Sequence, residues 1–467
     1  RRGFSKGNVF ALFSPNCPEF VVAFHAVASV GGIVTTINPL SNARELAIQL
    51  ADSGATWLVT VSALLSTAQE AADVVGLQHV WTFDGGDGVE PFSALAEDDD
   101  TLPMVGIDPR EDLVVLPFSS GTTGMPKGVM LTHYNLVAHD AQMEGIIPIR
   151  TDDTLIAVLP FFHIYGMSVV MNAGLSRGAT IVTMSRFDLQ RFLQIIQEQR
   201  VTVAFLVPPI VLALAKHPFI DSYDLSSLRV IVCGAAPLSS DVAEMCAERL
   251  GCSVMQGYGM TEASPVTHIG PVDGTRAASI GRCVRNTEAR IVDPTTGATL
   301  GINQHGELWV RGPQVMRGYL NRPDATSETI VEDGWLRTGD IAYVDDDGLF
   351  YVVDRLKELI KYKGYQIAPA ELESILLTHP SITDAAVIGI PNDESGEVPK
   401  AFVVRADDVT PEMVFAHVAE RVAPYKKLRE VEFVDLIPKS ASGKILRRNL
   451  IEQERERARS REAGVPV

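Results

Sequence analysis

The stretch LVVLPFSSGTTGMPKGV, residues 113–129, joins an apolar run typical of a buried strand to a loop of small and hydroxyl residues. Further short apolar, β-branched runs recur with helix-like segments between them: VFALFS, GGIVTTIN, TWLVTV, TLIAVLP, TIVTM, VTVAFLV and RVIVCG. This alternation predicts an α/β fold with mostly parallel strands. Ligands of such sheets bind beyond the carboxyl ends of the strands, which is where the loop of residues 119–124 falls.

The character of the sequence changes after about Ile280. Turn signals at DPTTG, RGP and VDDDG predict a β-rich subdomain that ends near Asp354. Beyond it, APAELESILLTHP and TPEMVFAHVAERV have helical apolar spacing, whereas DAAVIGI and KAFVVRA are strand-like. We therefore expect a large N-terminal domain of layered α/β subdomains plus a β-rich subdomain, followed by a small α+β domain.

The composition excludes several classes of protein. With 467 residues, 46% of them apolar and 21% charged, the chain is long enough for large cores and is not disordered. A net charge of −18 argues against a protein that binds nucleic acid. The five cysteines include no CxxC pair, which predicts neither a disulfide framework nor a zinc cluster. Because no signal peptide or apolar run of about 18 residues is found, we expect a cytoplasmic protein without a transmembrane segment.

Residues 119–129 predict a site for a polyphosphate. Gly121 and Gly124 permit backbone conformations in which consecutive amides face an anion. Further donors are Ser119, Ser120, Thr122, Thr123 and Lys127. The Walker A loop needs a lysine directly after its second glycine, and here Met125 and Pro126 intervene. A ligand-free turn is common for shorter fragments, but eleven residues of this composition favour binding.

This stretch resembles the signature [ST]-[SG]-G-[ST]-T-G-x-P-K-G of the adenylate-forming superfamily, which includes acyl-CoA synthetases, peptide-synthetase adenylation domains and beetle luciferases. Four more motifs follow in that superfamily's order: GYGMTE at 257–262, TGD at 338–340, DRLKELIKYKGYQIAPAELE at 354–373 and PKSASGKILRR at 438–448. FFHIYGM, GAAPL and EASPV are most similar to bacterial 4-coumarate–CoA ligase-like enzymes and fatty acyl-CoA ligases. Compared with the superfamily, we expect the chain to lack the usual first several dozen residues.

The resemblance implies an AMP-forming acid–CoA ligase that uses ATP, Mg²⁺ and coenzyme A. A carboxylate and ATP would give acyl-AMP and pyrophosphate, and CoA would then give the thioester and AMP. The resemblance also implies that residues 355–467 form a mobile domain that turns about Lys357 against residues 1–354. GELWVRG stands where the plant ligases have GEICIRG. A hydroxycinnamate-like aromatic acid and a medium- or long-chain fatty acid therefore both stay open as substrates.

The resemblance assigns a nucleotide site. Its ATP- and AMP-binding residues would be Ser119, Ser120, Gly121, Thr122, Thr123, Gly124, Lys127, Gln256, Gly257, Tyr258, Thr261, Asp340 and Arg355. Taken alone, Glu262 is a loop carboxylate and Asp340 the cap of a turn. The motifs imply instead that Glu262 binds Mg²⁺ and that Asp340 accepts hydrogen bonds from the ribose hydroxyls, with help from Arg355.

The catalytic residues implied by the resemblance are Lys444, Lys361, Gln366 and His163. Lys444 would stabilise the charge that develops as the carboxylate meets the α-phosphate. Lys361 and Gln366 would act in thioester formation, and His163 would lie beside the reacting carboxylate. The alternatives are ordinary surface charge for the lysines and a buried structural role for the histidine.

The remaining implied residues bind the acid or CoA. The acid pocket would contain Tyr165, Val169, Ala235, Gly259, Pro265 and Val266. CoA would contact Arg186, Lys363 and Gly364. Two rival functions are a stand-alone adenylation enzyme that loads a carrier protein and a luciferase-like oxygenase.

Overall fold

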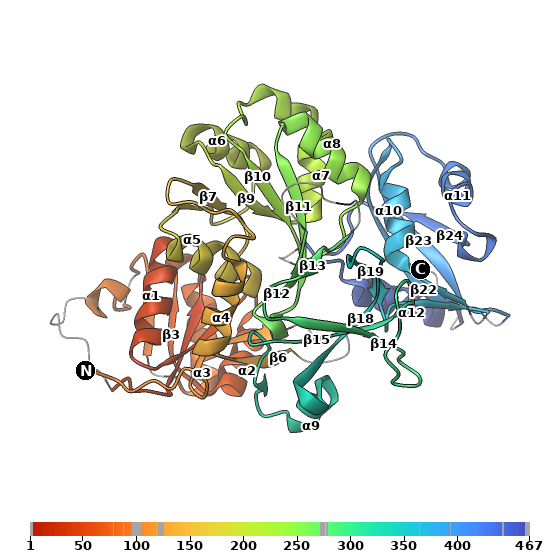
Figure 1. Cartoon of the computed structure of the whole chain (residues 1–467). Helices are drawn as coiled ribbons and strands as arrows, with labels where there is room; N and C mark the ends of the chain where they lie inside the picture. Colours follow the sequence, from red (N-terminus) through yellow and green to blue (C-terminus); the bar gives the residue numbers. More distant parts are fainter. Residues whose placement is uncertain are drawn as a thin grey trace.

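The strands of the molecule form four sheets with helices packed around them (Figure 1). The computed structural model describes residues 3–77, 79–86, 88–95, 104–119, 126–270, 276, 279–363, 365–392, 394–440 and 443–462. Two α/β sheets and an antiparallel sheet precede a smaller C-terminal α+β unit, drawn in blue. The predicted fold class is confirmed by this architecture.

The first sheet is parallel except at one edge. Its strands, in spatial order, are β16 (Gly318–Tyr319), β6 (Lys127–Thr132), β5 (Leu113–Ser119), β2 (Ile33–Ile37), β1 (Val9–Phe13), β3 (Ala55–Thr60) and β4 (His79–Thr82). The helical segments of this part are α1 (Pro18–Ser29), α2 (Ala43–Ser53), η1 (Ser62–Leu64), α3 (Leu65–Val75), η2 (Phe92–Leu95) and α4 (His133–Met143). β6 and β16 are antiparallel additions that the apolar pattern does not predict.

The second sheet repeats this arrangement. Its spatial order is β13 (Arg282–Cys283), β12 (Val266–Ile269), β11 (Ser253–Gly259), β10 (Val230–Cys233), β9 (Val203–Leu206), β7 (Thr154–Ala157) and β8 (Thr180–Thr183). Its helical segments are the π-helix η3 (Tyr165–Asn172), α5 (Ala173–Ser176), α6 (Leu189–Gln199), α7 (Pro208–Lys216), η4 (Pro218–Ser222), α8 (Ser240–Leu250) and η5 (Thr261–Ala263). One continuous apolar core connects this sheet to the first.

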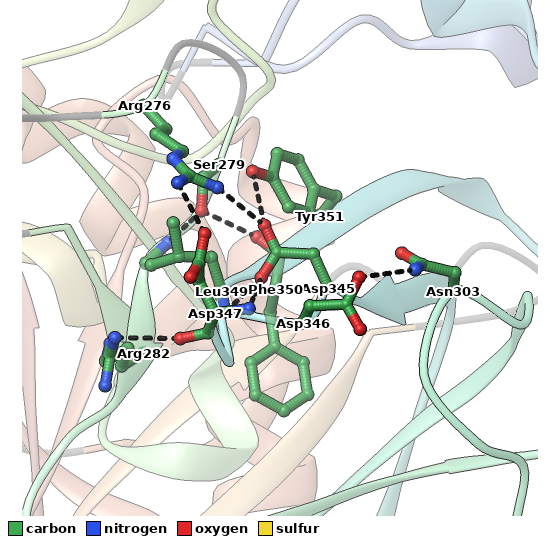
Figure 2. Close-up of polar contacts among 11 residues, drawn as sticks. Arg276, Ser279, Arg282, Asn303, Asp345, Asp346, Asp347, Leu349, Phe350 and Tyr351 are labelled. Atoms are coloured by element: carbon green, nitrogen blue, oxygen red, sulfur yellow. Dashed lines mark hydrogen bonds and ion pairs between the residues drawn. The ribbon is translucent and has the colours of Figure 1, made fainter.

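The third sheet is antiparallel and corresponds to the predicted β-rich subdomain. It contains β14 (Glu288–Val292), β15 (Gly306–Arg311), β18 (Trp335–Val344), β17 (Ile330–Val331) and β19 (Phe350–Arg355), with α9 (Pro323–Thr329) and η6 (Glu332–Gly334) beside them. Figure 2 shows the turn between β18 and β19, where Asp345 accepts a hydrogen bond from the Tyr351 hydroxyl at 3.0 Å. Arg276 forms ion pairs with Asp345 and Asp347 of the same turn. These contacts fix the hairpin whose other end carries Asp340 and Arg355.

The C-terminal unit has its own apolar core, built around Leu372, Val387 and Val403. Its strands are β21 (Tyr365–Ile367), β20 (Ile360–Tyr362), β23 (Gly396–Arg405), β22 (Ile382–Asn392) and β24 (Glu430–Phe433). Its helical segments are α10 (Pro369–Leu377), α11 (Pro411–Ala419), η7 (Pro424–Lys426) and α12 (Arg447–Glu462). Proline at the first turn starts α10 and α11, where its missing N–H costs nothing. Among the described helices, none combines the length and the apolar composition that crossing a membrane requires.

Candidate active site

Ser119 and Lys127 stand at the two ends of the predicted phosphate loop. They are paired in register on the antiparallel strands β5 and β6. β5 runs parallel to β2, so its carboxyl end, where Ser119 lies, is the edge at which α/β sheets bind ligands. The predicted residues Ser120, Gly121, Thr122, Thr123 and Gly124 lie outside the described residues.

His163 lies in the loop that follows β7, immediately before η3. Its Nδ1 accepts a hydrogen bond from the backbone N–H of Tyr165 at 3.2 Å, so the neutral ring carries its proton on Nε2. Burial, and after it the charge of Lys444, lower the pKa of His163 to about 4. The ring is therefore uncharged at neutral pH and lies within the electrostatic range of Lys444.

Asn16 holds the His163 loop from the first sheet. Its side-chain amide donates hydrogen bonds to the carbonyl oxygens of Ala157 and Leu159, both at 2.9 Å. Its Oδ1 accepts a hydrogen bond from the backbone N–H of Phe161 at 2.7 Å. Because Asn16 is buried and fully occupied by these bonds, it fixes the path of the chain toward His163.

The predicted acid-pocket residues come from three neighbouring segments: Tyr165 and Val169 on η3, Ala235 after β10, and Gly259, Pro265 and Val266 at the β11–β12 connection. The Tyr165 hydroxyl donates a hydrogen bond to the Val232 carbonyl at 3.0 Å, which lays the ring across β10. A Cβ on Gly234 would lie 3.1 Å from this ring, and a Cβ on Gly259 only 2.0 Å from the Pro265 carbonyl oxygen. The pocket wall therefore depends on glycine where backbone and ring approach closely.

Glu262 lies in η5 and is 6% exposed. Its Oε1 accepts a hydrogen bond from the Tyr319 hydroxyl at 2.8 Å, and its backbone carbonyl accepts one from the N–H of Met316 at 2.8 Å. The Lys127 ammonium lies 4.5 Å from the centroid of the Tyr319 ring. Tyr319 thus connects the carboxylate predicted to bind Mg²⁺ with the lysine predicted to bind phosphate.

The chemistry at Glu262 fits a Mg²⁺ ion that is bound together with ATP. Mg²⁺ prefers one or two carboxylates plus phosphate oxygens. Tyr319 occupies Oε1, which leaves Oε2 for an ion. No group of three or more His, Cys, Asp or Glu side chains in the described ranges could hold a metal by itself. The site therefore suits a metal that needs the nucleotide to complete its coordination.

Asp340, the residue predicted to bind the ribose, is the centre of a second group of polar contacts. Its Oδ2 accepts a hydrogen bond from the Tyr258 hydroxyl at 2.5 Å, and its Oδ1 lies 3.2 Å from Nε of Arg355. Asp340 and Arg355 are paired in register on β18 and β19. Burial, and then the neighbouring Asp340 carboxylate, raise the pKa of Tyr258, so its hydroxyl stays protonated and donates. Gln256, Gly257 and Thr261 flank Tyr258 on β11 and η5.

Lys444 reaches this cluster from the C-terminal unit. Gly443 packs against the segment between β9 and α7, since a Cβ there would lie 3.1 Å from Cγ2 of Val207. Burial, followed by the Arg355 charge, lowers the pKa of Lys444 to about 8, while Asp340 acts in the opposite direction. Lys444 therefore lies within the electrostatic range of Asp340, Arg355 and His163, between the residues predicted to bind the acid and those predicted to bind the nucleotide.

Several predicted residues lie apart from this cluster. Arg186 is exposed between β8 and α6, Lys357 is exposed between β19 and β20, and Lys361 and Lys363 are exposed on the β20–β21 hairpin. Within the part of the chain that the structure describes, no hydrogen bond or ion pair joins them to Asp340 or Lys444. Gly364 and the side chain of Gln366 lie outside the described residues.

Asn16 and Tyr319 are site residues that the sequence interpretation missed. Neither lies in a motif that points to a ligand, and each acts through a partner that is distant in sequence. His139 is a third: its buried Nε2 accepts a hydrogen bond from the backbone N–H of Val266 at 3.1 Å, behind the acid pocket. Burial lowers the pKa of His139 to about 3, so this ring also stays neutral.

Comparison with known families agrees with this geometry. The family model described as AMP-binding enzyme matches residues 1–320, and the model described as AMP-binding enzyme C-terminal domain matches residues 371–444. The chain belongs to the AMP-binding enzyme family. The resemblance read from the motifs is thereby confirmed.

Relatives of this AMP-binding enzyme are ligases. It is 46% identical to 4-coumarate–CoA ligase 5 of Oryza sativa subsp. japonica over 96% of its own length and 85% of the relative's. The anthranilate CoA ligase AuaEII in complex with anthranoyl-AMP superposes with a TM-score of 0.90 at 27% identity, covering 97% and 88% of the two chains. ATP-bound MatB from Rhodopseudomonas palustris gives a TM-score of 0.88 at 28% identity over 97% and 90% of the chains, and apo MatB gives 0.77.

Proposed function

We propose that this chain is an AMP-forming acid–CoA ligase that activates an aromatic, hydroxycinnamate-like acid. The ligase class, predicted from the motifs, is confirmed by the family match and by 4-coumarate–CoA ligases at 44–46% identity over 96% of the chain. The observation that carries the mechanism is the convergence of Lys444 with Asp340, Arg355 and His163. The choice of acid rests on the plant relatives, with a medium- or long-chain fatty acid as the alternative.

The first step forms the acyl-adenylate. A carboxylate oxygen attacks the α-phosphorus of ATP, the α–β phosphoanhydride bond breaks, and pyrophosphate leaves. Asp340 accepts hydrogen bonds from the ribose hydroxyls, while Lys127 and the loop of residues 119–124 hold the phosphates. Lys444 places a positive charge between two anions that repel each other, where charge develops in the transition state. Mg²⁺ held by Glu262 would neutralise phosphate charge when bound.

The second step forms the thioester. The CoA thiolate attacks the acyl carbon, and AMP leaves with the electron pair of the broken acyl–phosphate bond. Lys361 and Gln366 serve this step, with CoA against Arg186, Lys363 and Gly364. In the described structure, Arg186, Lys361 and Lys363 form no hydrogen bond or ion pair with Asp340 or Lys444. A rotation of residues 355–467 about Lys357 would exchange the two sets. The neutral His163 ring lies beside the carbon that reacts.

We expect the rate of adenylate formation to fall as the pH rises above about 8. The Lys444 ammonium is charged below its pKa and neutral above it, so its stabilisation of the transition state is lost on the alkaline side. A pH profile of pyrophosphate–ATP exchange measures this effect. Lys444→Arg should remove the alkaline limb, because arginine stays charged throughout this range. An unchanged limb in that variant would assign the titration to another group.

We expect Lys361→Ala to slow thioester formation from supplied acyl-AMP by at least about 10-fold and to affect adenylate formation much less. Adenylate formation should be affected less because Lys361 lies on an exposed hairpin and does not contact the Lys444 cluster in the described structure. Single-turnover measurements of each half-reaction separate the two effects. Equal loss of both steps would show that Lys361 does not belong to the second step.

The substrate proposal is tested by CoA-dependent AMP release with cinnamic, hydroxycinnamic and benzoic acids and with medium- and long-chain fatty acids. Hydroxycinnamic acids are expected to give the highest kcat/KM. A preference for fatty acids would overturn the aromatic assignment while leaving the ligase class intact. Acyl transfer to a carrier protein but not to CoA, or light emission with oxygen consumption, would support one of the two rival functions.

A further inference from the structure

Arg447, the first residue of α12, lies in a largely buried cluster of ion pairs outside the site described above. Its Nη2 donates hydrogen bonds to Glu373 Oε1 and Oε2 at 2.8 and 2.7 Å, and its Nη1 donates to Glu358 Oε2 at 2.5 Å. Its Nε donates to the Val387 carbonyl at 3.3 Å. The side chains of Arg447, Glu358 and Glu373 are 12%, 16% and 9% exposed. This is a buried, bidentate ion-pair cluster of the kind that fixes geometry.

The partners of Arg447 connect two functional segments. Glu358 directly follows Lys357, the proposed hinge, whereas Arg447 lies three residues after Lys444. The loop that carries Lys444 is closed by backbone hydrogen bonds. The Ser440 N–H donates to the Lys444 carbonyl at 2.8 Å, and the Leu446 N–H donates to the Pro438 carbonyl at 2.8 Å. Lys444 therefore lies on the returning arm of a small closed loop, and Arg447 directly follows the base of that loop.

The same cluster touches the end of β19. Oδ2 of Asp354 accepts a hydrogen bond from the N–H of Ala370 at 2.9 Å, in the first turn of α10, the helix that also carries Glu373. Asp354 immediately precedes Arg355, the partner of Asp340. Burial raises the pKa of both Asp354 and Glu373, and Arg447 opposes this shift in each case. The positive charge of Arg447 thus offsets the cost of burying the Asp354 and Glu373 carboxylates.

We propose that Arg447 is a positioning residue for adenylate formation, which ties the segment after Lys357 to the loop that carries Lys444. Rotation about the hinge then moves Lys444 as part of a rigid body and delivers it beside Asp340 and His163. In the thioester step Lys444 is withdrawn, so the tie is not needed there. This inference rests on the role proposed for Lys444.

The test is Arg447→Lys, which keeps a positive charge but loses the fork that binds Glu373 and Glu358 together. We expect the rate of adenylate formation, measured by pyrophosphate–ATP exchange, to fall about 10- to 100-fold, because a small misplacement of a catalytic group has effects of this size. Thioester formation from supplied acyl-AMP and CoA should be unchanged. Combining Arg447→Lys with Lys444→Ala should slow adenylation no further than Lys444→Ala alone, because both act through one group.

The matched control is Arg457→Lys on the same helix. Arg457 contacts both oxygens of Glu432 at 2.7 Å, in an ion pair remote from the hinge, and its replacement should leave both half-reactions unchanged. If Arg447→Lys does not fold, Glu358→Gln removes one partner while Glu373 still binds the arginine, and it should slow the first step alone.

The outcomes separate this inference from the proposed function. If Arg447→Lys slows both half-reactions equally, or if the losses are additive in the double variant, Arg447 has only a structural role and the inference is wrong. Full adenylation activity in Arg447→Lys would overturn the inference directly. If Lys444→Ala itself leaves adenylation intact, the failure lies instead with the role proposed for Lys444.

Discussion

Lys444→Ala is expected to slow adenylate formation by roughly 100- to 1,000-fold, which corresponds to about 3–4 kcal/mol of lost transition-state stabilisation. Lys444 lies between the proposed acid site and the proposed nucleotide site, and its pKa responds to Arg355 and Asp340. Among the described residues, Lys444 is the lysine whose charge lowers the pKa of His163. Pyrophosphate–ATP exchange measures the loss, and thioester formation from supplied acyl-AMP should stay largely intact.

Lys439→Ala is the matched control for this experiment. Lys439 lies five residues before Lys444 and forms a partly buried ion pair with Asp384 at 2.6 Å, within the C-terminal unit. Its loss should change adenylation little, because Lys439 does not face the nucleotide site. A comparable loss in both variants would mean that the loop, and not the Lys444 charge, limits the reaction.

Asp340→Asn is expected to raise the KM for ATP about 10- to 100-fold and to lower the free energy of unfolding by roughly 1–3 kcal/mol. The asparagine amide is uncharged and has only one accepting oxygen. Either the Tyr258 hydroxyl or Arg355 therefore loses its acceptor, and the negative charge is lost to both. The ribose hydroxyls lose the same acceptor when ATP binds. Steady-state kinetics with varied ATP and thermal unfolding with and without ATP measure the two effects.

The chain offers a close control for Asp340. Asp153 and Arg229 form another buried ion pair at 2.8 Å, with side-chain exposures of 4% and 30% against 6% and 33% for Asp340 and Arg355. Asp153→Asn should therefore cost similar stability without changing the KM for ATP. A raised KM in both variants would attribute the effect of Asp340→Asn to general destabilisation and not to ribose binding.

The strands and helices were largely predictable because their signals are local. The apolar runs VFALFS and RVIVCG became β1 and β10, and the helical spacing of APAELESILLTHP became α10. The edges were not predictable: β12 and β16 are short, and the pairing of β16 with β6 joins distant parts of the chain. The π-helix η3 also escaped prediction, since its apolar sequence fits an ordinary helix equally well.

The candidate site divides in the same way. The motifs by themselves determined the residues proposed to meet ATP, including Asp340, Glu262 and Lys444, because each motif carries its chemistry within a few residues. Only the tertiary structure decided what orients them: Asn16 lies 145 residues from Phe161, Tyr319 lies 57 from Glu262, and Arg447 lies 89 from Glu358. A buried polar side chain has no sequence period of its own, so its partner is settled only when the sheets and the C-terminal unit pack together.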